Sequence, residues 1–464
     1  MDVELYKYDI YPKVFPVNCE TEITIRMFGD NKNYTGEKDG FSQSGYYIVM
    51  LCHVDSGNDV SKYEKFRTTA GEDGMLRVLY TAKAEGEHYV CIEHYDERET
   101  RTYVVMLSVY ALEEDLACRI PLRGDFHIHT SRSDGGEVPG LVCANYRKAG
   151  YDFIVITDHH RYYPSLEAIA AYKDTDAALH IIPGEEVHLP NTMVHIVNAG
   201  GSYSVNGLMK GSHQYKTCGD DLTRCSSDGR SPAAITREEY DRQIEEIMES
   251  GRCDGCPEAD RQSYAVCLWA FDHIKAGGGL AILAHPLWRC NLYNLSIPYT
   301  KFMLKEHPFD ALEVLGGAAQ PHQYYGTNGL QSALYYEEWL EGRIHPIVGS
   351  TDSHDSTEHN RNKTVASTIV FAHENHYGDI FASVKERYSV AVDTFSGDFR
   401  LVGPFRLQKY ANFLLYHWYP IHDRLTAMDG EIMREYYFGE AEAEELACMK
   451  KKSDAMFKKY FKTI

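Results

Sequence analysis

The sequence predicts an α/β protein in which a small all-β sandwich precedes a (β/α) barrel. Short segments rich in Tyr, Val, Ile and Thr fill residues 1–120, whereas apolar runs alternate with helical stretches over residues 121–398. The chain has 464 residues, which is enough for two to three domains, or for one large barrel with an added module. Residues 399–464 have the pattern of amphipathic helices, and we expect them to form a C-terminal helical extension.

The first segment has the pattern of an antiparallel sandwich. Its strand-like stretches, such as residues 22–26 and 46–50, are separated by clusters of Gly, Asn and Asp. Tyr89 and Cys91 have the tyrosine-corner spacing of immunoglobulin-like domains, and Cys19 is a candidate to lie opposite Cys91. We expect both cysteines to be reduced core residues, because the chain shows no export signal.

The second segment consists of apolar runs that are each followed by a helical stretch. Together with a strand over residues 125–129, the runs at 153–156, 180–182, 195–197, 280–283, 311–314 and 347–348 bring the count of strands to seven. Continuous hydrophobicity is typical of parallel strands buried on both faces, and the intervening helices indicate right-handed crossovers. A (β/α) barrel is the simplest closure, and it places chemistry at the carboxyl ends of the strands.

A polar insertion interrupts the barrel pattern at about residues 200–263, with one predicted helix at residues 236–250. Long insertions in barrel loops are usually lids or substrate contacts. The insertion contains Cys253 and Cys256, which with Cys218 and Cys225 are candidates for a structural zinc site. We favour reduced, unliganded thiols.

Charge and hydropathy exclude several classes of function. The 47 Lys and Arg against 68 Asp and Glu give a net charge of −21, which disfavours binding to long nucleic acid. Uninterrupted apolar runs of membrane-spanning length and a secretory signal are missing from the sequence, so we expect no membrane partner and a cytoplasmic location. The basic residues near the C-terminus are expected to form a solvated helix face.

Histidines and acidic residues gather at the ends of the predicted strands. These candidate metal ligands are His127, His129, His159, Glu186, His195, His285, Asp352 and His354. Imidazole and carboxylate groups are the ligands that borderline divalent cations use, and a carboxylate such as Glu186 can bridge two ions. We interpret His88, His180, His273 and His322 as core or surface residues.

These motifs resemble those of the PHP (polymerase and histidinol phosphatase) superfamily of metal-dependent phosphoesterases. The matching segments are His127–Thr130 with Ser133–Gly135, Thr157–His159, Gly184–Glu186, His195, Ala284–Pro286 and Asp352–His354. They occur in family order from about Arg123 to the mid-390s, so the sandwich and the C-terminal helices lie outside the resemblance. The resemblance implies a distorted (β/α)7 barrel that holds two to three divalent ions, which we expect to be Mn, Zn or Fe.

The resemblance also implies the ligands of each ion. The first ion takes His127, His129, Glu186 and Asp352, the second shares Glu186 and adds His195 and His285, and the third takes Asp134, His159 and His354. Many members have His where this chain has Asp134, which leaves the identity and occupancy of the third ion open, although a carboxylate is a competent ligand. The Gly-x-Glu spacing selects Glu186 over Glu185, and Asp158 is expected to orient neighbouring groups.

Basic side chains near the strand ends are candidates for binding a phosphate. Arg289 lies four residues after His285, and a guanidinium can form two bonds to phosphate oxygens. Arg161 is the second candidate, and Arg361 and Lys363 are weaker ones.

The leading prediction is an enzyme that hydrolyses a small phosphomonoester with a metal-activated water, in which Asp352 or His354 supplies the proton for the leaving group. The alternatives are hydrolysis of a phosphodiester or nucleotide at the same site, and a non-catalytic metal-binding regulatory or adhesive module. The oligomeric state is not predicted.

Overall fold

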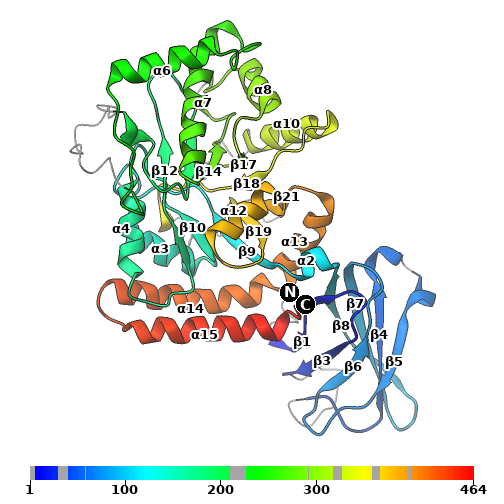
Figure 1. Cartoon of the computed structure of the whole chain (residues 1–464). Helices are drawn as coiled ribbons and strands as arrows, with labels where there is room; N and C mark the ends of the chain where they lie inside the picture. The colour runs from blue at the N-terminus through cyan, green and yellow to red at the C-terminus, as the bar shows by residue number, and fades with distance from the viewer. Residues whose placement is uncertain are drawn as a thin grey trace. The chain divides into compact units, whose positions relative to one another are not determined.

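The computed structural model describes residues 6–29, 40–57, 59–209, 226–290, 292–316, 327–357, 366–394 and 399–463. The chain forms two compact units (Figure 1). Unit 1 comprises residues 1–120, 405–425 and 450–464, and unit 2 comprises residues 121–404 and 426–449. The segment expected as a separate C-terminal extension is therefore divided between both units.

Unit 1 contains two β-sheets around one hydrophobic core. The antiparallel three-stranded sheet has the order β1 (Tyr8–Tyr11), β3 (Thr21–Met27), β6 (Leu76–Tyr80). The five-stranded sheet has the order β2 (Val14–Pro16), β8 (Arg101–Leu112), β7 (Gly86–Tyr95), β4 (Tyr46–His53), β5 (Glu64–Thr68). Buried aliphatic residues of both sheets, such as Ile23 and Val90, form a single cluster, because alternate residues of each strand face inward.

Helices complete unit 1. They are α2 (Glu114–Ala117), α13 (Phe405–His417), the first part of α14 (Tyr419–Tyr437) and the last part of α15 (Ala443–Tyr460). The Tyr110 ring of β8 packs 4.9 Å from Tyr410 and 5.2 Å from Phe413, between ring centroids. The expected sandwich therefore does not stand alone, since C-terminal aromatic residues cover part of it. Cys19 and Cys91 are free thiols, as expected, but both are only partly buried, so the expectation that they are core residues was wrong.

Unit 2 has two mixed sheets with helices around them. The six-stranded sheet has the order β11 (His180–Ile182), β10 (Phe153–Val155), β9 (Ile120–Asp125), β19 (Ala366–Ala372), β20 (Ser389–Asp393), β21 (Arg400–Val402). The five-stranded sheet has the order β12 (Gly184–Val187), β13 (Ile196–Ala199), β14 (Leu280–Leu283), β17 (Ala311–Leu315), β18 (Ile347–Gly349). A short hairpin joins β15 (Arg289–Cys290) to β16 (Leu292–Tyr293).

The pairing corrects the expectation of parallel units throughout. Strands β9, β10 and β11 pair in parallel, as do β14, β17 and β18. However, β13 is antiparallel to both β12 and β14, and β20 is antiparallel to both β19 and β21. The predicted strand at residues 125–129 is also shifted, because β9 ends at Asp125.

The helices of unit 2 surround these strands in Figure 1. They are α3 (Pro139–Lys148), α4 (Tyr163–Tyr172), α6 (Arg237–Glu249), α7 (Arg261–Ala276), α8 (Ile297–Glu306), α10 (Gly329–Leu340), α12 (Tyr377–Lys385) and the remaining parts of α14 and α15. Met433 of α14 and Leu446 of α15 belong to the same buried cluster as Val142 of α3. Within the described ranges, no helix combines the length and the hydropathy of a membrane span.

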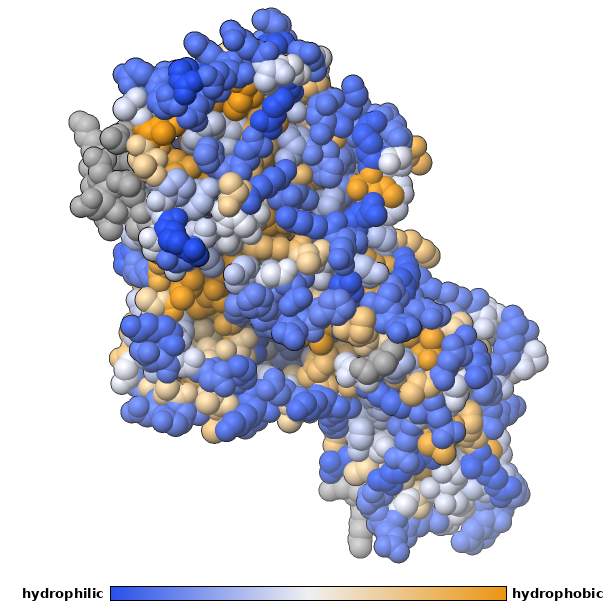
Figure 2. Space-filling view, in the orientation of Figure 1, coloured by the Kyte–Doolittle hydropathy of each residue, from blue (hydrophilic) through white to orange (hydrophobic). Residues whose placement is uncertain are grey.

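The predicted helix in the insertion corresponds to α6. The Thr236 side chain accepts a hydrogen bond from the Glu239 backbone N–H, which caps the helix start. Tyr240 and Ile244 are its buried residues, four apart on one face, and the Tyr240 ring packs against Trp269 of α7. The side of α6 that Figure 2 shows is mostly hydrophilic. Cys218 and Cys225 lie outside the described residues, and Cys253 and Cys256 are free thiols.

Candidate metal centre

The strand ends of unit 2 bring the candidate ligands to one edge of the sheets. His127 and His129 follow β9, and Glu186 lies in β12, where it pairs with His159 in an isolated parallel bridge. His195 precedes β13 rather than following it. Because β13 runs antiparallel, its start lies beside the ends of its neighbours, with Ile196 opposite Val187 and Leu283. The antiparallel strand thus carries His195 to the same edge as His285.

A first group of ligand atoms surrounds Asp352. Its Oδ1 atom lies 3.0 Å from Nε2 of His129 and 3.4 Å from Nε2 of His127. These atoms lie within 4.8 Å of one another and form a group that could hold a metal ion. Both imidazoles are fully buried.

A second group is formed by Glu186, His195 and His285, whose ligand atoms also lie within 4.8 Å of one another. Oε1 of Glu186 lies 2.8 Å from Nδ1 of His195 and 3.7 Å from Nε2 of His285. The other oxygen of Glu186 lies 3.5 Å from Nε2 of both His127 and His129. The Glu186 carboxylate therefore lies between the first and second groups.

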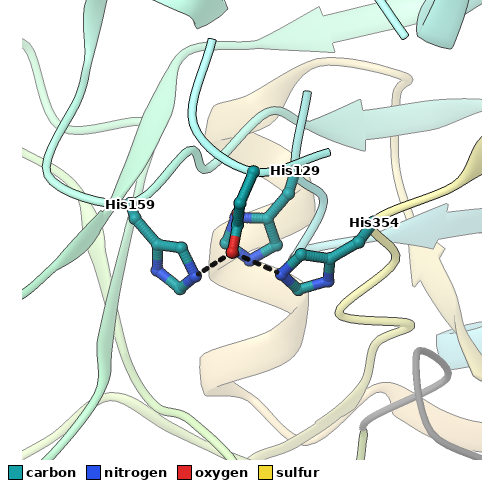
Figure 3. Close-up of side chains that lie close together, drawn as sticks. His129, His159 and His354 are labelled. Atoms are coloured by element: carbon teal, nitrogen blue, oxygen red, sulfur yellow. Dashed lines mark ion pairs between the residues drawn. The ribbon is translucent and has the colours of Figure 1, made fainter. Parts of the chain in front are cut away.

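A third group gathers around Asp134. Its Oδ2 atom lies 3.5 Å from Nε2 of His159 and 3.4 Å from Nε2 of His354, and dashed lines mark these two contacts in Figure 3. Nδ1 of His129 lies 3.9 Å from Oδ1, so the three labelled rings face one carboxylate. The Asp134 side chain is 55% exposed, which makes this the most open part of the centre.

Burial and charge act against each other in the centre. Burial alone would raise the pKa of Glu186, but the surrounding imidazoles hold it well below its usual range. Burial disfavours a charged His127, yet Asp352, Glu186 and Glu313 raise its pKa well above the ordinary value. His129 behaves in the opposite way, because burial and the neighbouring His159 lower its pKa to about 3.

The donor set fits divalent transition ions. Several buried ligand atoms make no hydrogen bond within the described part of the chain, and these are Nε2 of His127, Nδ1 of His129, Nδ1 of His195 and both oxygens of Glu186. Buried polar atoms without partners are rare in folded proteins, and each one is costly. Converging imidazole nitrogens and carboxylate oxygens are the ligands of zinc, iron and manganese, so bound ions would satisfy these atoms.

Two buried carboxylates, those of Asp158 and Asp125, hold the backbone next to the metal ligands. Asp158 accepts hydrogen bonds from the Thr130 N–H and from the hydroxyls of Thr130 and Ser133, which holds the loop that leads to Asp134. Asp125 accepts from the backbone N–H groups of His127 and Thr351, and burial raises its pKa to about 7. Asp158 thus has the supporting contacts expected of an orienting group.

Glu313 and His188 belong to the centre but were missed in the sequence. Oε2 of Glu313 lies 2.9 Å from Nδ1 of His127, and Oε1 accepts from the His285 N–H at 3.3 Å. A charged residue inside the apolar strand β17 was the available signal for Glu313. For His188 the signal was its position two residues after Glu186, because residues two apart face the same side of a strand.

Three residues of the centre or next to it have a strained backbone. His160, His285 and Asp352 have φ values of 59°, 21° and 49°, in the left-handed region that non-glycine residues rarely adopt. Such conformations cost about 1 to 3 kcal/mol each and cluster at functional sites. Asn191, His307 and Arg387 of unit 2 also have positive φ values, so the strain accompanies the ligands but does not by itself mark the site.

The predicted phosphate-binding residues lie on loops beside the centre. Arg289 is exposed in the two-residue strand β15, and Arg161 is partly buried directly after His160. The ring that lies against the centre from this loop is Trp288, 6.0 Å from His195 and 6.3 Å from His285 between ring centroids. Arg361 and Lys363 lie outside the described residues.

Comparisons with known proteins gave structural similarities only. No family model and no curated protein matches the chain. One similar solved structure is a two-domain protein of Bacteroides vulgatus that contains a predicted PHP-like metal-dependent phosphoesterase. It is 17% identical to this chain, with a TM-score of 0.36. The similarity covers 59% of this chain and 65% of that one, which is slightly under two thirds of its length.

Two further similar structures have lower TM-scores. A proposed metal-dependent phosphoesterase of Bifidobacterium adolescentis is 18% identical, with a TM-score of 0.29, over 50% of this chain and 87% of that one. An amidohydrolase of Chromobacterium violaceum, with bound sulfate and no metal, is 15% identical, with a TM-score of 0.28, over 51% of this chain and 88% of that one. Similarities of this size assign neither a family nor an activity, so the functional conclusion rests on the site.

Proposed function

We propose that the protein is a metal-dependent phosphoesterase that hydrolyses a small phosphomonoester. The observation that carries the proposal is the convergence of three ligand groups from the strand ends of both sheets of unit 2, with the Glu186 carboxylate between two of them. His127, His129, Glu186 and Asp352 would hold the first ion, His195 and His285 with Glu186 the second, and His159, His354 and Asp134 the third. Bound divalent ions supply Lewis-acid activation of a phosphate ester and of the attacking water.

Asp352 and His354 differ in how they can handle the leaving-group proton. Asp352 faces two buried imidazoles, which hold its pKa below the usual range despite burial, so it acts as a ligand. Nδ1 of His354 donates to the Asp352 backbone carbonyl at 2.9 Å, which leaves Nε2 facing the open side of the centre. Because Nε2 is also the atom that would bind the third ion, His354 can supply the leaving-group proton only when that ion is absent.

One cavity lies along the loop between the candidate ligands Glu186 and His195. A cavity of about 400 Å³ is lined by Leu189–Met193 and by Ser263 and Tyr299. The loop that lines it connects β12 to β13, and the candidate ligands Glu186 and His195 stand at its two ends. Its lining residues include none of the candidate metal ligands, so its volume does not set the size of the substrate. Arg289 and Arg161 are the proposed contacts for the outward phosphate oxygens.

The test is a screen of phosphorylated metabolites with protein reconstituted in manganese, zinc or iron, read as free phosphate. We expect phosphate release that Glu186→Gln abolishes and the surface variant Arg237→Lys leaves unchanged. Release of a nucleoside monophosphate from a diester, with no action on monoesters, would replace this substrate class with the diester alternative. Metal-loaded protein that is inactive on every ester would refute the proposed function.

A further inference from the structure

The imidazole of His188 faces the centre but lies outside the ligand set that the PHP resemblance implies. Its Nε2 atom lies 3.2 Å from Oε2 of Glu186 and 2.9 Å from Nδ1 of His159. Nδ1 of His159 in turn lies 2.5 Å from the same Glu186 oxygen. Two imidazole nitrogens and one carboxylate oxygen therefore converge on one point.

Hydrogen bonds alone do not satisfy these three atoms. Each facing ring nitrogen either carries a hydrogen or presents a lone pair. If only one of the two nitrogens carries a hydrogen, the other nitrogen directs its lone pair at the Glu186 carboxylate oxygen, which repels it. If both nitrogens carry hydrogens, these two hydrogens face each other between nitrogens only 2.9 Å apart. A divalent cation, by contrast, accepts all three lone pairs at once.

The separations are close to those of ligands that share an ion. Nitrogen and oxygen ligands about 2.1 Å from an ion lie about 3.0 Å apart at a right angle and about 3.4 Å apart at a tetrahedral angle. The separations of 2.5, 2.9 and 3.2 Å need only small outward movements to match. Glu186, His159 and His188 accordingly form a group that could hold an ion.

The backbone around His188 is held in place by Asn206. The Asn206 Oδ1 atom accepts from the His188 N–H at 3.0 Å, and its Nδ2 donates to the Glu186 carbonyl at 3.2 Å and to the Glu185 carboxylate at 2.9 Å. Glu185 also accepts from the Ser204 hydroxyl and the Asn198 amide. This buried network fixes the end of β12, so the His188 side chain starts from a rigid backbone position.

The position is also reachable. The side chains of His188 and His159 are 21% and 24% exposed, whereas Glu186 is fully buried. An ion bound here would have protein ligands on its inner side and an open outer side. A catalytic metal needs such an open side, whereas a structural metal is enclosed by its ligands.

We propose that His188 is a metal ligand, which binds a divalent transition ion through Nε2 together with Nδ1 of His159 and Oε2 of Glu186. This inference rests on the proposed metal-dependent function and deepens it. A neutral imidazole offers one lone pair, so His159 binds either this ion through Nδ1 or the third ion through Nε2, which faces Asp134. The added imidazole favours zinc, iron or cobalt over magnesium at this position.

The test is Co²⁺ loading of the full chain, of His188→Ala and of the control His180→Ala. His180 carries an imidazole of the same unit on β11, where it contacts His376 and Tyr377 away from the centre. The readouts are Co²⁺ bound per chain, the affinity for the weakest ion, and the number of imidazoles with strongly shifted proton NMR signals. We expect His188→Ala to lose one shifted imidazole and at least tenfold in that affinity, and His180→Ala to match the unmodified chain.

An unchanged number of shifted imidazoles in His188→Ala overturns the proposal, because a residue that only orients His159 would not itself be shifted. If His188→Ala does not fold, His188→Gln gives the same readout with a side chain of similar reach. Failure of the proposed metal-dependent function would give a different result from failure of the His188 proposal. An unmodified chain that binds no Co²⁺ refutes the proposed function, and the His188 proposal with it.

Discussion

Glu313 provides the sharpest prediction about what supports the metal centre. Its carboxylate is fully buried in β17 and contacts Nδ1 of His127 and the backbone N–H of His285. A carboxylate that accepts from the second nitrogen of a ligand imidazole fixes the tautomer and orientation of that ring. Glu313→Gln keeps the shape of the side chain but offers only one accepting oxygen, so one of the two contacts is lost whichever way the amide turns.

The size of the effect follows from these contacts. A hydrogen bond to a charged group contributes about 1.5 to 3 kcal/mol. The loss of one such bond should weaken metal affinity by about 10- to 100-fold, as is usual for residues that orient metal ligands. The expected change lies in the affinity and not in the number of ions at saturating metal, because Glu313 contacts Nδ1 of His127, whereas Nε2 of that ring faces Glu186 and Asp352.

The measurement is a zinc competition titration against a chromophoric chelator. The matched control is Glu338→Gln, which alters a buried carboxylate of α10 that pairs with Arg343 outside the centre. We expect the control to lose stability in urea but to keep its zinc affinity. Equal zinc affinities for Glu313→Gln and the unmodified chain would refute the argument that Glu313 orients His127.

Three further predictions concern stability and substrate binding. Burial lowers the pKa of His88 to about 4, below about 6.5 in the unfolded chain, so the unfolded state binds more protons between these values. The free energy of unfolding should therefore fall by up to about 3 kcal/mol as the pH drops from about 6.5 to about 4, and urea unfolding of His88→Asn should lack this part of the slope. Arg147 is buried between Asp429 at 2.6 Å and Asp152 at 3.1 Å. In urea unfolding, Arg147→Met should lower the free energy of unfolding by about 3 to 5 kcal/mol, and the double variant Arg147→Met with Asp429→Leu should recover part of that loss. A loss under 1 kcal/mol for Arg147→Met would contradict this prediction. Arg289→Lys should keep the metal content but lower kcat/KM for phosphate esters at least about tenfold, and unchanged kinetics would move the phosphate contact to Arg161.

Patterns along the chain predicted the strands of unit 2 better than their directions. The apolar runs at residues 180–182 and 280–283 coincide with β11 and β14. An apolar run does not encode whether its neighbour is parallel, however, and the antiparallel direction of β13 was not foreseen. His195 reached the expected edge all the same, because the start of an antiparallel strand and the end of a parallel one lie together.

Contacts between distant segments account for what the sequence did not reveal. Glu313 follows His127 by 186 positions, so no local spacing connects them. The division of the C-terminal helices between both units depends on aromatic packing such as Tyr110 against Tyr410, which amphipathic periodicity does not specify. His188 is different, because its position two residues after Glu186 is a local signal that the sequence does contain.

The central claim is that the ligand groups around Glu186 bind metal ions, and metal content tests it most directly. The full chain and Glu186→Gln would be reconstituted with zinc or manganese, freed of excess metal and analysed for metal per chain. We expect two to three ions in the full chain and the loss of at least one in Glu186→Gln with the fold retained. Fewer than one ion per chain after reconstitution, or the same content in both proteins, would contradict it.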